Sequence, residues 1–398
     1  MKRVGPRFGR FLLKVIAKQS TNYRSRSILA YVQLTSTHGV HNFNSLFVII
    51  SPTGLKKARM KSFIRTLVWS SLPLLVLYTL APLLVFLFPH FMQHLFFLNF
   101  VKFPWREYHN LTEHGVDSVG LNFYIDGQAL EDGYRPRLGL WHVLPYGLKP
   151  ENGNVNQQTM EKILKEDNRP VVVYLHGNSF DRTTRHRIEL YKILSKMGFH
   201  VFALDYRGYG DSTGRPTEDG IVADSRCVFD YVRELIPDRP LLVWGHSMGT
   251  GVATRLVSEL SQEDKNPTAL VLESPFNNLR DVINNHPFSA PFRFLPWFDH
   301  LVIQPLIESG LIMQSDQRIK KITCPILVFH AADDHIIPIK LGKKLVESAE
   351  KAGRNIRLVE FEPSRAFFHK YIHRAAEVPD IVMEFFEMSK SQQTKKSP

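Results

Sequence analysis

A five-residue segment, Gly245-His246-Ser247-Met248-Gly249, limits the architectures open to this chain more than any other part of it. It follows a short apolar run at residues 241–244 and leads into a helical pattern at residues 250–260. The two glycines carry no Cβ atom, so a strand and a helix can pass closely at a sharp turn. A serine at the apex of such a turn is held in strained backbone geometry with its hydroxyl group exposed. We therefore interpret Ser247 as a nucleophile.

Short apolar runs alternate with helical patterns over most of the chain. The runs are residues 138–144, 170–175, 200–204, 241–244, 269–272, 326–329 and 356–361. The helical patterns are residues 157–165, 184–197, 219–235, 250–260, 340–351 and 378–388. Uninterrupted apolar runs of this length are typical of parallel strands that are buried on both faces. The alternation predicts an α/β fold with one mostly parallel sheet flanked by helices, in a catalytic domain at residues 136–390.

The alternation stops between residues 275 and 323. This stretch shows no strand pattern and is rich in aromatic residues, among them Phe288, Phe294 and Trp297. Insertions of this length between regular elements are typical of lids over binding sites. We predict a small lid at about 275–323.

Candidate partners of Ser247 follow the last two apolar runs. Asp333 and Asp334 come after the sixth run, and His369 and His373 come after the seventh. In sheets of this kind the catalytic residues lie on loops at the carboxyl ends of strands, in the chain order serine, acid, histidine. We predict a triad of Ser247, Asp334 and His369, with Asp333 as the second choice for the acid and His373 as a rival base. The serine would attack an acyl carbonyl, the histidine would carry its proton, and the carboxylate would orient the imidazole.

A triad of this kind needs two hydrogen-bond donors for the oxyanion that forms on the substrate. One should be the backbone N–H of Met248, directly after the nucleophile at the start of the helix. The other should come from the loop after the run at 170–175, and we assign it to the backbone N–H of Asn178. No spacing of Cys and His residues resembles a zinc site, and we expect neither a metal nor a cofactor.

The charge distribution separates the N-terminal segment from the rest of the chain. Residues 1–65 contain 13 Lys and Arg and no Asp or Glu, so the net charge of +12 belongs to this segment. From residue 66 onward, 37 basic residues stand against 38 acidic ones. A nucleic-acid-binding protein carries its basic surface on the folded domain, so this pattern excludes nucleic acid as a partner.

Residues 67–88 form an uncharged run of 22 residues, of which 14 are Leu, Val or Phe. As a helix this run would be about 33 Å long, enough to cross a hydrocarbon core of about 30 Å. Basic residues lie close before it, whereas the first charges after it are Lys102 and Arg106. Since basic flanks stay on the cytoplasmic side, we predict a transmembrane signal-anchor helix at 66–89. The segment 1–65 would then be cytoplasmic, and the catalytic domain would be lumenal or extracellular.

A second targeting signal is present near the N-terminus. Between residues 8 and 18, apolar and basic residues alternate with helical spacing and no acid occurs. Such a helix either lies on an anionic cytoplasmic leaflet or serves as a mitochondrial transit peptide. A mitochondrial membrane is therefore the alternative location.

Residues 90–135 are predicted to be a juxtamembrane segment. Its aromatic residues suit either the membrane interface or packing against the folded domain. Asn110 begins the sequon Asn110-Leu111-Thr112 and is a candidate glycosylation site. Cys227 and Cys324 are interpreted as two thiols, although a disulfide bond between them is left open. Residues 391–398 are polar and basic, and we expect a disordered tail.

Several of these stretches together resemble the α/β-hydrolase superfamily over roughly residues 138 to 390. More narrowly, the chain is similar to the membrane-anchored monoacylglycerol and lysophosphatidylserine lipases of the α/β-hydrolase-domain group. The stretches that carry this resemblance are Leu140-Trp141-His142-Val143-Leu144-Pro145, Trp244-Gly245-His246-Ser247-Met248-Gly249-Thr250, Leu272-Glu273-Ser274-Pro275-Phe276 and His369-Lys370-Tyr371-Ile372. The resemblance implies a single-pass protein of the endoplasmic reticulum with a lumenal lipase domain and a triad at Ser247, Asp334 and His369.

The expected function is that of a membrane-anchored serine hydrolase. Its expected substrates are single-chain acyl glycerolipids drawn from the bilayer, lysophosphatidylserine first and monoacylglycerol second. A serine peptidase or a thioesterase would use the same triad. A non-catalytic membrane-anchored binding protein is the alternative from another class.

Overall fold

The structure is a computed structural model that describes residues 12–19, 28–35, 48–50, 57–88, 93, 96–102, 105–131 and 133–394. The chain divides into two compact units, Met1–Ala81 and Pro82–Pro398, and each is described by itself. The site residues predicted from the sequence all belong to the second unit.

The first unit contains three antiparallel strands and most of one helix. The strands are β1 (Leu12–Gln19), β2 (Ile28–Thr35) and β3 (Val48–Ile50), and the helix is α1 (Lys57–Leu87). The helix expected at residues 8–18 is wrong where the structure describes it, because β1 pairs with β2 in antiparallel register. In the sequence, apolar residues at positions 13, 15 and 17 also recur with a period of two residues, which is typical of a strand.

Over the described residues, no helix is at once long and apolar enough to cross a membrane. The signal anchor at 66–89 stays a prediction from the sequence.

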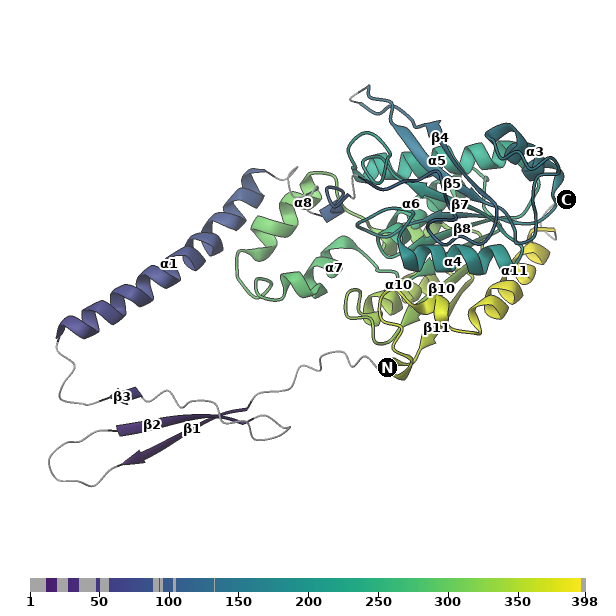
Figure 1. Cartoon of the computed structure of the whole chain (residues 1–398). Coiled ribbons are helices and arrows are strands. Elements are labelled where there is room, and N and C mark those ends of the chain that lie inside the picture. Colours follow the sequence, from purple (N-terminus) through teal and green to yellow (C-terminus); the bar gives the residue numbers. More distant parts are fainter. Residues whose placement is uncertain are drawn as a thin grey trace. The chain divides into compact units, whose positions relative to one another are not determined.

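The second unit is built on an eight-stranded sheet with the order β11-β10-β9-β8-β6-β7-β5-β4 (Figure 1). The strands are β4 (Gly120–Asp126), β5 (Arg137–Val143), β6 (Val171–Leu175), β7 (His200–Asp205), β8 (Leu241–His246), β9 (Ala269–Glu273), β10 (Ile326–Ala331) and β11 (Ile356–Phe361). Neighbouring strands from β11 to β7 pair in parallel, whereas β5 pairs antiparallel with both β7 and β4. This topology confirms the predicted mostly parallel sheet.

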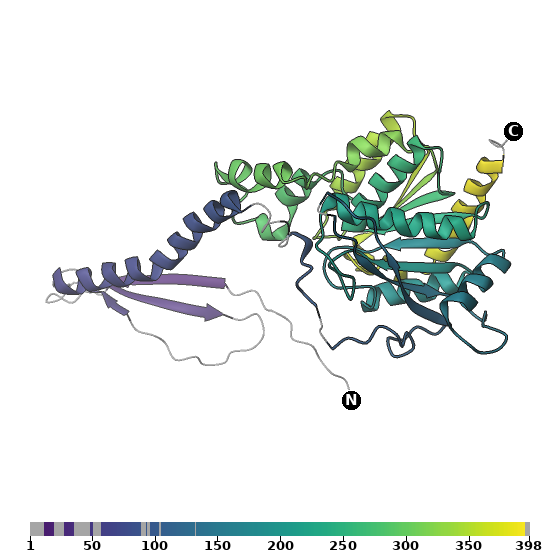
Figure 2. The ribbon, with the colours of Figure 1, turned by 90° about the horizontal axis from the view of Figure 1, so that it is seen from above.

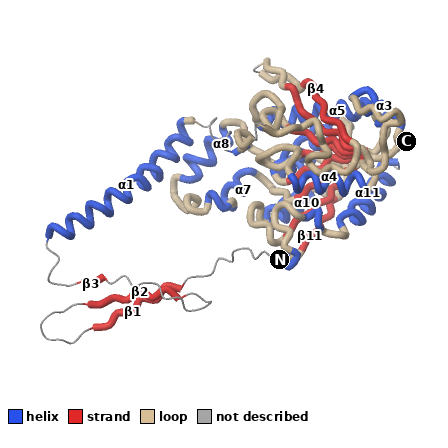
Figure 3. The backbone as a smooth tube through the Cα atoms, in the orientation of Figure 1, coloured by secondary structure: helices blue, strands red, loops and turns tan. Residues whose placement is uncertain are grey.

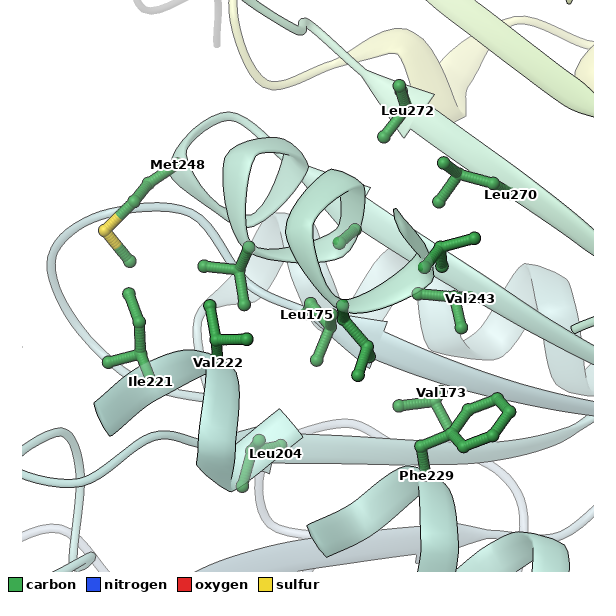
Figure 4. Close-up of a cluster of buried hydrophobic side chains, with 14 of the residues drawn as sticks. Val173, Leu175, Leu204, Ile221, Val222, Phe229, Val243, Met248, Leu270 and Leu272 are labelled. Atoms are coloured by element: carbon green, nitrogen blue, oxygen red, sulfur yellow. The ribbon is translucent and has the colours of Figure 1, made fainter. Parts of the chain in front are cut away.

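Helices lie on both faces of the sheet, as Figures 2 and 3 show. They are α3 (Gln157–Glu166), α4 (Arg185–Lys196), α5 (Glu218–Leu235), α6 (Met248–Gln262), α10 (Ile339–Lys351) and α11 (Val378–Thr394). Apolar side chains of α3, α5, α6 and α10 share one buried cluster with the sheet, and those of α4 and α11 share the other. In the first cluster Met248 extends from the start of α6 toward Ile221 of α5 (Figure 4). Each fully buried Val, Leu, Ile or Phe contributes about 1.5 to 3 kcal/mol to folding.

Two boundaries differ from those expected from the sequence. The sheet begins at β4, so the domain starts before residue 136, and Phe97 is fully buried in the core of the same unit. This part of the juxtamembrane segment packs against the folded domain, whereas Trp105 is 90% exposed. At the other end α11 continues to Thr394, and its apolar residues up to Phe386 pack on the sheet. Residues 395–398 lie outside the described part.

The insertion between β9 and β10 consists of short helices joined by turns and irregular segments. It contains α7 (Leu279–Asn285), α8 (Gln304–Glu308) and α9 (Ser315–Arg318), together with short turns at Pro287–Ser289, Asp299–Ile303 and Ile319–Lys321. Glu218 holds its C-terminal end, because one carboxylate oxygen accepts the N–H groups of Ile312 and Met313 at 2.6 and 2.7 Å. Two aromatic residues near its middle, Phe288 and Phe294, are 81% exposed each, whereas Phe298 is buried.

Candidate active site

Ser247 lies at the junction between β8 and α6, in a left-handed conformation with φ of +52°. The junction is tight on both sides. A Cβ atom on Gly245 would lie 2.4 Å from the carbonyl oxygen of Gly249, and one on Gly249 would lie 2.1 Å from that of Leu175. The Ser247 N–H donates to the carbonyl of Glu273 at 2.9 Å, which fixes the turn to the end of β9. The predicted strand-turn-helix is therefore present, and only glycine fits at its two flanking positions.

Three predicted residues from distant parts of the chain meet at this turn. Ser247 Oγ lies 2.8 Å from His369 Nε2, and His369 Nδ1 lies 2.7 Å from Asp334 Oδ2. Since a carboxylate only accepts, Nδ1 carries the imidazole proton and Nε2 is left to accept from the serine hydroxyl. All three side chains are buried, between 4% and 8% exposed. This chain of hydrogen bonds can take a proton from Ser247 as it attacks and return it to a leaving group.

Asp334 is held in place from both sides of its carboxylate. Its Oδ1 accepts the backbone N–H groups of Ile336 and Ile337 at 2.9 Å each, while His330 lies 3.6 Å from Oδ2. Burial acts to raise the pKa of Asp334, but the contacts with His330 and His369 outweigh it and lower the pKa below the usual carboxyl range. The carboxylate therefore stays ionised at neutral pH and keeps the tautomer of His369 fixed.

The two alternative residues occupy other positions. Asp333 accepts the backbone N–H of Phe368 at 3.1 Å, so it supports the loop that carries His369. His373 lies on a short turn at Ile372–Arg374, and burial lowers its pKa. The hydrogen bonds to Ser247 and within the triad are made by His369 and Asp334.

Both residues predicted to serve the oxyanion lie beside Ser247. Met248 is the first residue of α6, where N–H groups lack an intrahelical partner. The loop that carries Asn178 passes so close that a Cβ atom on Gly177 would lie 3.0 Å from Ser247 Cβ. Tyr209 connects the two, because its hydroxyl lies 3.2 Å from Asn178 Oδ1 and 3.8 Å from Met248 Sδ.

Glu273 is a buried carboxyl directly behind the turn. Its backbone carbonyl accepts from Ser247, and its side chain accepts from the indole of Trp244 at 3.1 Å. Burial raises the pKa of Glu273 to about 7, above its ordinary value of 4.5. Between pH 4.5 and 7 the folded chain therefore binds more protons than the unfolded chain at this group, so its contribution to stability falls as the pH rises.

The substitution Glu273→Gln is expected to remove this pH dependence. The amide resembles the protonated carboxyl and does not ionise, so we expect the variant to match the wild type at pH 5. At pH 8 it should be more stable by roughly 1 to 3 kcal/mol. Unfolding by urea at both pH values measures the difference, and an equal loss of stability in the two proteins between pH 5 and pH 8 would show that Glu273 does not titrate in this way.

The remaining predicted residues lie away from the site. Asn110 is exposed and donates to Glu113 at 2.8 Å, and its glycosylation stays a prediction. Cys227 and Cys324 are not joined by a disulfide bond. Within the described ranges, no three or more His, Cys, Asp or Glu side chains are grouped so as to hold a metal ion.

Sequence reasoning missed Arg187, a buried charged residue next to the site. It lies 2% exposed on α4, where Leu190, Tyr191 and Leu194 are also buried. Its position one turn before Tyr191 places it on the apolar stripe of the helix. A charged residue on such a stripe was a signal available in the sequence.

The fold and the constellation around Ser247 define the class of α/β hydrolases. A family model described as serine aminopeptidase S33 matches residues 166–306. The esterase Pf2001 of Pyrococcus furiosus has a similar fold, with a TM-score of 0.52 at 21% identity over 72% of this chain and 96% of that chain.

Similar proteins of known name show to which family of α/β hydrolases the chain belongs. Lysophosphatidylserine lipase ABHD12 of Xenopus tropicalis is 40% identical over 80% of this chain and 82% of its own length. The protein of the same name from Gallus gallus is 40% identical over 81% of this chain and 83% of its own length. The chain belongs to the ABHD12 family of α/β hydrolases.

Proposed function

We propose that the chain is a serine hydrolase that cleaves the acyl ester of lysophospholipids, lysophosphatidylserine first, and of monoacylglycerols second. The observation that carries this proposal is the hydrogen-bonded chain from Ser247 through His369 to Asp334. The relatives named lysophosphatidylserine lipase support the choice of substrate.

The reaction has two halves. Ser247 Oγ attacks the ester carbonyl while His369 Nε2 takes its proton, and the N–H groups of Met248 and Asn178 stabilise the oxyanion. His369 then protonates the leaving glycerol oxygen, and an acyl group remains on Ser247. Water, deprotonated by His369, attacks this acyl-enzyme, releases the fatty acid and restores the serine.

The same triad serves peptidases and thioesterases, and the matching family model bears the description of an aminopeptidase. A panel of lysophosphatidylserine, monoacylglycerol, an acyl thioester and an aminoacyl amide compares kcat/KM for each reaction. We expect the two lipid esters to exceed the amide by at least about 100-fold, or about 2.7 kcal/mol in activation free energy. A preference for the amide would identify a peptidase instead.

A non-catalytic binding protein would bind the lipid without chemistry at Ser247. Reaction with a fluorophosphonate probe separates the two possibilities, because the probe modifies only an activated serine. Labelling of the wild type that is lost in Ser247→Ala supports the hydrolase, and equal labelling of both proteins contradicts it.

The insertion is proposed to act as the lid that admits lipid. Phe288 and Phe294 are its most exposed aromatic side chains, and each can enter a bilayer surface with a gain of about 1.5 to 3 kcal/mol. The double substitution Phe288→Ser/Phe294→Ser is expected to raise the apparent KM for lysophospholipid in vesicles by about 10-fold or more. Hydrolysis of a soluble short-chain ester should stay within about 2-fold of wild type.

The matched control for this pair is Met388→Ser, an exposed apolar residue on α11 outside the insertion. It is expected to leave both reactions unchanged. A double variant that hydrolyses vesicle lipid as well as the wild type would contradict the role of the insertion.

The chain is further proposed to be a single-pass protein of the endoplasmic reticulum membrane, with its N-terminus cytoplasmic. The uncharged run at residues 67–88 and the basic segment before it support this location, and Leu67, Trp69 and Phe88 each expose more than half of their surface. Endoglycosidase treatment tests the orientation. A mobility shift that disappears in Asn110→Gln is the expected result, whereas import into mitochondria would favour the alternative location.

A further inference from the structure

Arg187 is a buried cation for which the proposed reaction has no use. Its guanidinium donates to three backbone carbonyls of a single loop, those of Asp181 at 2.7 Å, Gly177 at 3.0 Å and Ser179 at 2.9 Å. Buried arginines are ordinarily paired with carboxylates, since an unpaired buried charge is costly. Among the described residues, the hydrogen-bond partners of this guanidinium are carbonyls of one loop. We infer that its role is to stabilise the conformation of this loop.

The loop needs such support because its backbone is unfavourable. Ser179 and Phe180 are consecutive non-glycine residues with φ of +62° and +56°, and both lie in the left-handed region that side chains disfavour. The carbonyls that Arg187 binds lie before this pair at Gly177, within it at Ser179 and after it at Asp181. The guanidinium therefore bridges the two ends of the strained turn.

One of these carbonyls has a direct relation to the site. The carbonyl of Gly177 and the N–H of Asn178 belong to the same peptide group, and in a planar trans peptide the two point in opposite directions. This carbonyl oxygen accepts from two donors, Arg187 Nη2 at 3.0 Å and His176 Nδ1 at 2.7 Å. Two donors on the oxygen fix the peptide plane, and with it the direction of the Asn178 N–H. Hydrogen bonds to the oxygen also polarise the N–H and make it a stronger donor.

We propose that Arg187 is a positioning residue of the oxyanion hole, which aims the Asn178 N–H at the oxyanion by holding the Gly177 carbonyl from behind. The inference rests on the proposed function, because it assumes that Ser247 forms a tetrahedral intermediate. Arg187 itself touches no reacting atom. Its effect is expected in the transition state, where the oxyanion carries its charge, rather than in the binding of substrate.

The test uses the full-length chain in detergent micelles with a soluble p-nitrophenyl ester. Arg187→Met keeps the apolar stem and removes the donors, and Arg187→Lys keeps the charge with a single donor group. The matched control is Arg233→Met, because Arg233 on α5 also donates to three backbone carbonyls, those of Ile236, Pro237 and Arg239. Each protein is measured for kcat, for KM and for inhibition by a trifluoromethyl ketone, which forms a tetrahedral oxyanion adduct with the serine.

Arg187→Met is expected to lower kcat by about 10- to 100-fold, with KM within about 3-fold of wild type. The inhibition constant of the ketone should rise in proportion to the loss of kcat, and Arg187→Lys should lie between. Arg233→Met should retain wild-type kcat within about 2-fold. A folded Arg187→Met with kcat within about 3-fold of wild type, or a loss confined to KM, would overturn the proposal.

Two further outcomes are distinguishable. If Arg187→Met does not fold, the lysine variant decides by the same criteria, and an unchanged kcat and inhibition constant in it would overturn the proposal. If the wild type neither hydrolyses the ester nor reacts with a fluorophosphonate, the proposed function fails, and the inference about Arg187 fails with it.

Discussion

The substitution Ser247→Ala is expected to lower kcat for ester hydrolysis by about 10⁴- to 10⁶-fold and to abolish labelling by fluorophosphonate probes. The physical reason is that alanine lacks the hydroxyl group that would attack the ester and be activated by His369. Ser247 Oγ lies 2.8 Å from His369 Nε2, and two glycines with no space for a side chain hold the backbone around it. The measurement is the initial rate on a p-nitrophenyl ester, with labelling followed on the same samples.

Ser274→Ala is the matched control. Ser274 is also buried and also has φ of +52°, but its hydroxyl makes no hydrogen bond to the residues that the structure describes. This variant should keep kcat within about 3-fold of wild type. Residual activity above about 1% in Ser247→Ala, or an equal loss in the control, would argue against Ser247 as the nucleophile.

The second large effect is expected at Asp334. In Asp334→Asn the Oδ1 atom can still accept from Ile336 and Ile337, so the loop should keep its shape. The new amide group, however, would donate to His369 Nδ1 and force the proton onto Nε2, which can then no longer accept from Ser247. A loss of about 10⁴-fold in kcat is expected, measured together with the thermal unfolding temperature.

Asp333 provides the comparison for Asp334, because the sequence analysis kept it as the second choice for the acid of the triad. Asp333→Asn removes a carboxylate that accepts only one backbone N–H from the loop bearing His369. We expect kcat to fall by less than about 10-fold. If Asp333→Asn were the more damaging of the two, the carboxylate of the triad would have been assigned to the wrong residue.

The features of this molecule that could be predicted are those that depend on residues close together in the sequence. The central strands β6, β8 and β9 coincide with short apolar runs, because strands buried on both faces need apolar side chains at most positions. The edge strand β11 is only partly buried and carries Arg357 and Glu360 within its run. Gly245 and Gly249 are required because a Cβ atom at either position would lie 2.4 or 2.1 Å from a backbone carbonyl oxygen. The two glycines therefore indicated the turn in the sequence alone. The chain order of Ser247, Asp334 and His369 then predicted that all three lie on loops at the carboxyl ends of their strands.

The parts that were not predictable depend on the packing of distant segments. Strand β4 is an edge strand with only two buried residues, Asn122 and Phe123, and it lacks the apolar run that marks its neighbours. The choice between Asp333 and Asp334 depends on which carboxylate the loop turns toward His369, and two adjacent aspartates give no local signal of this. The role inferred for Arg187 follows from the path of the loop at residues 177–181, which only the three-dimensional structure provides.

The central claim is that this chain hydrolyses a lysophospholipid by chemistry at Ser247. Its most direct test is the release of fatty acid from lysophosphatidylserine by purified full-length wild type and Ser247→Ala, side by side in vesicles of the same composition. The account predicts steady release by the wild type and none above the uncatalysed rate by the variant. Equal release by both proteins, or no release by a wild type that still reacts with a fluorophosphonate, would contradict it.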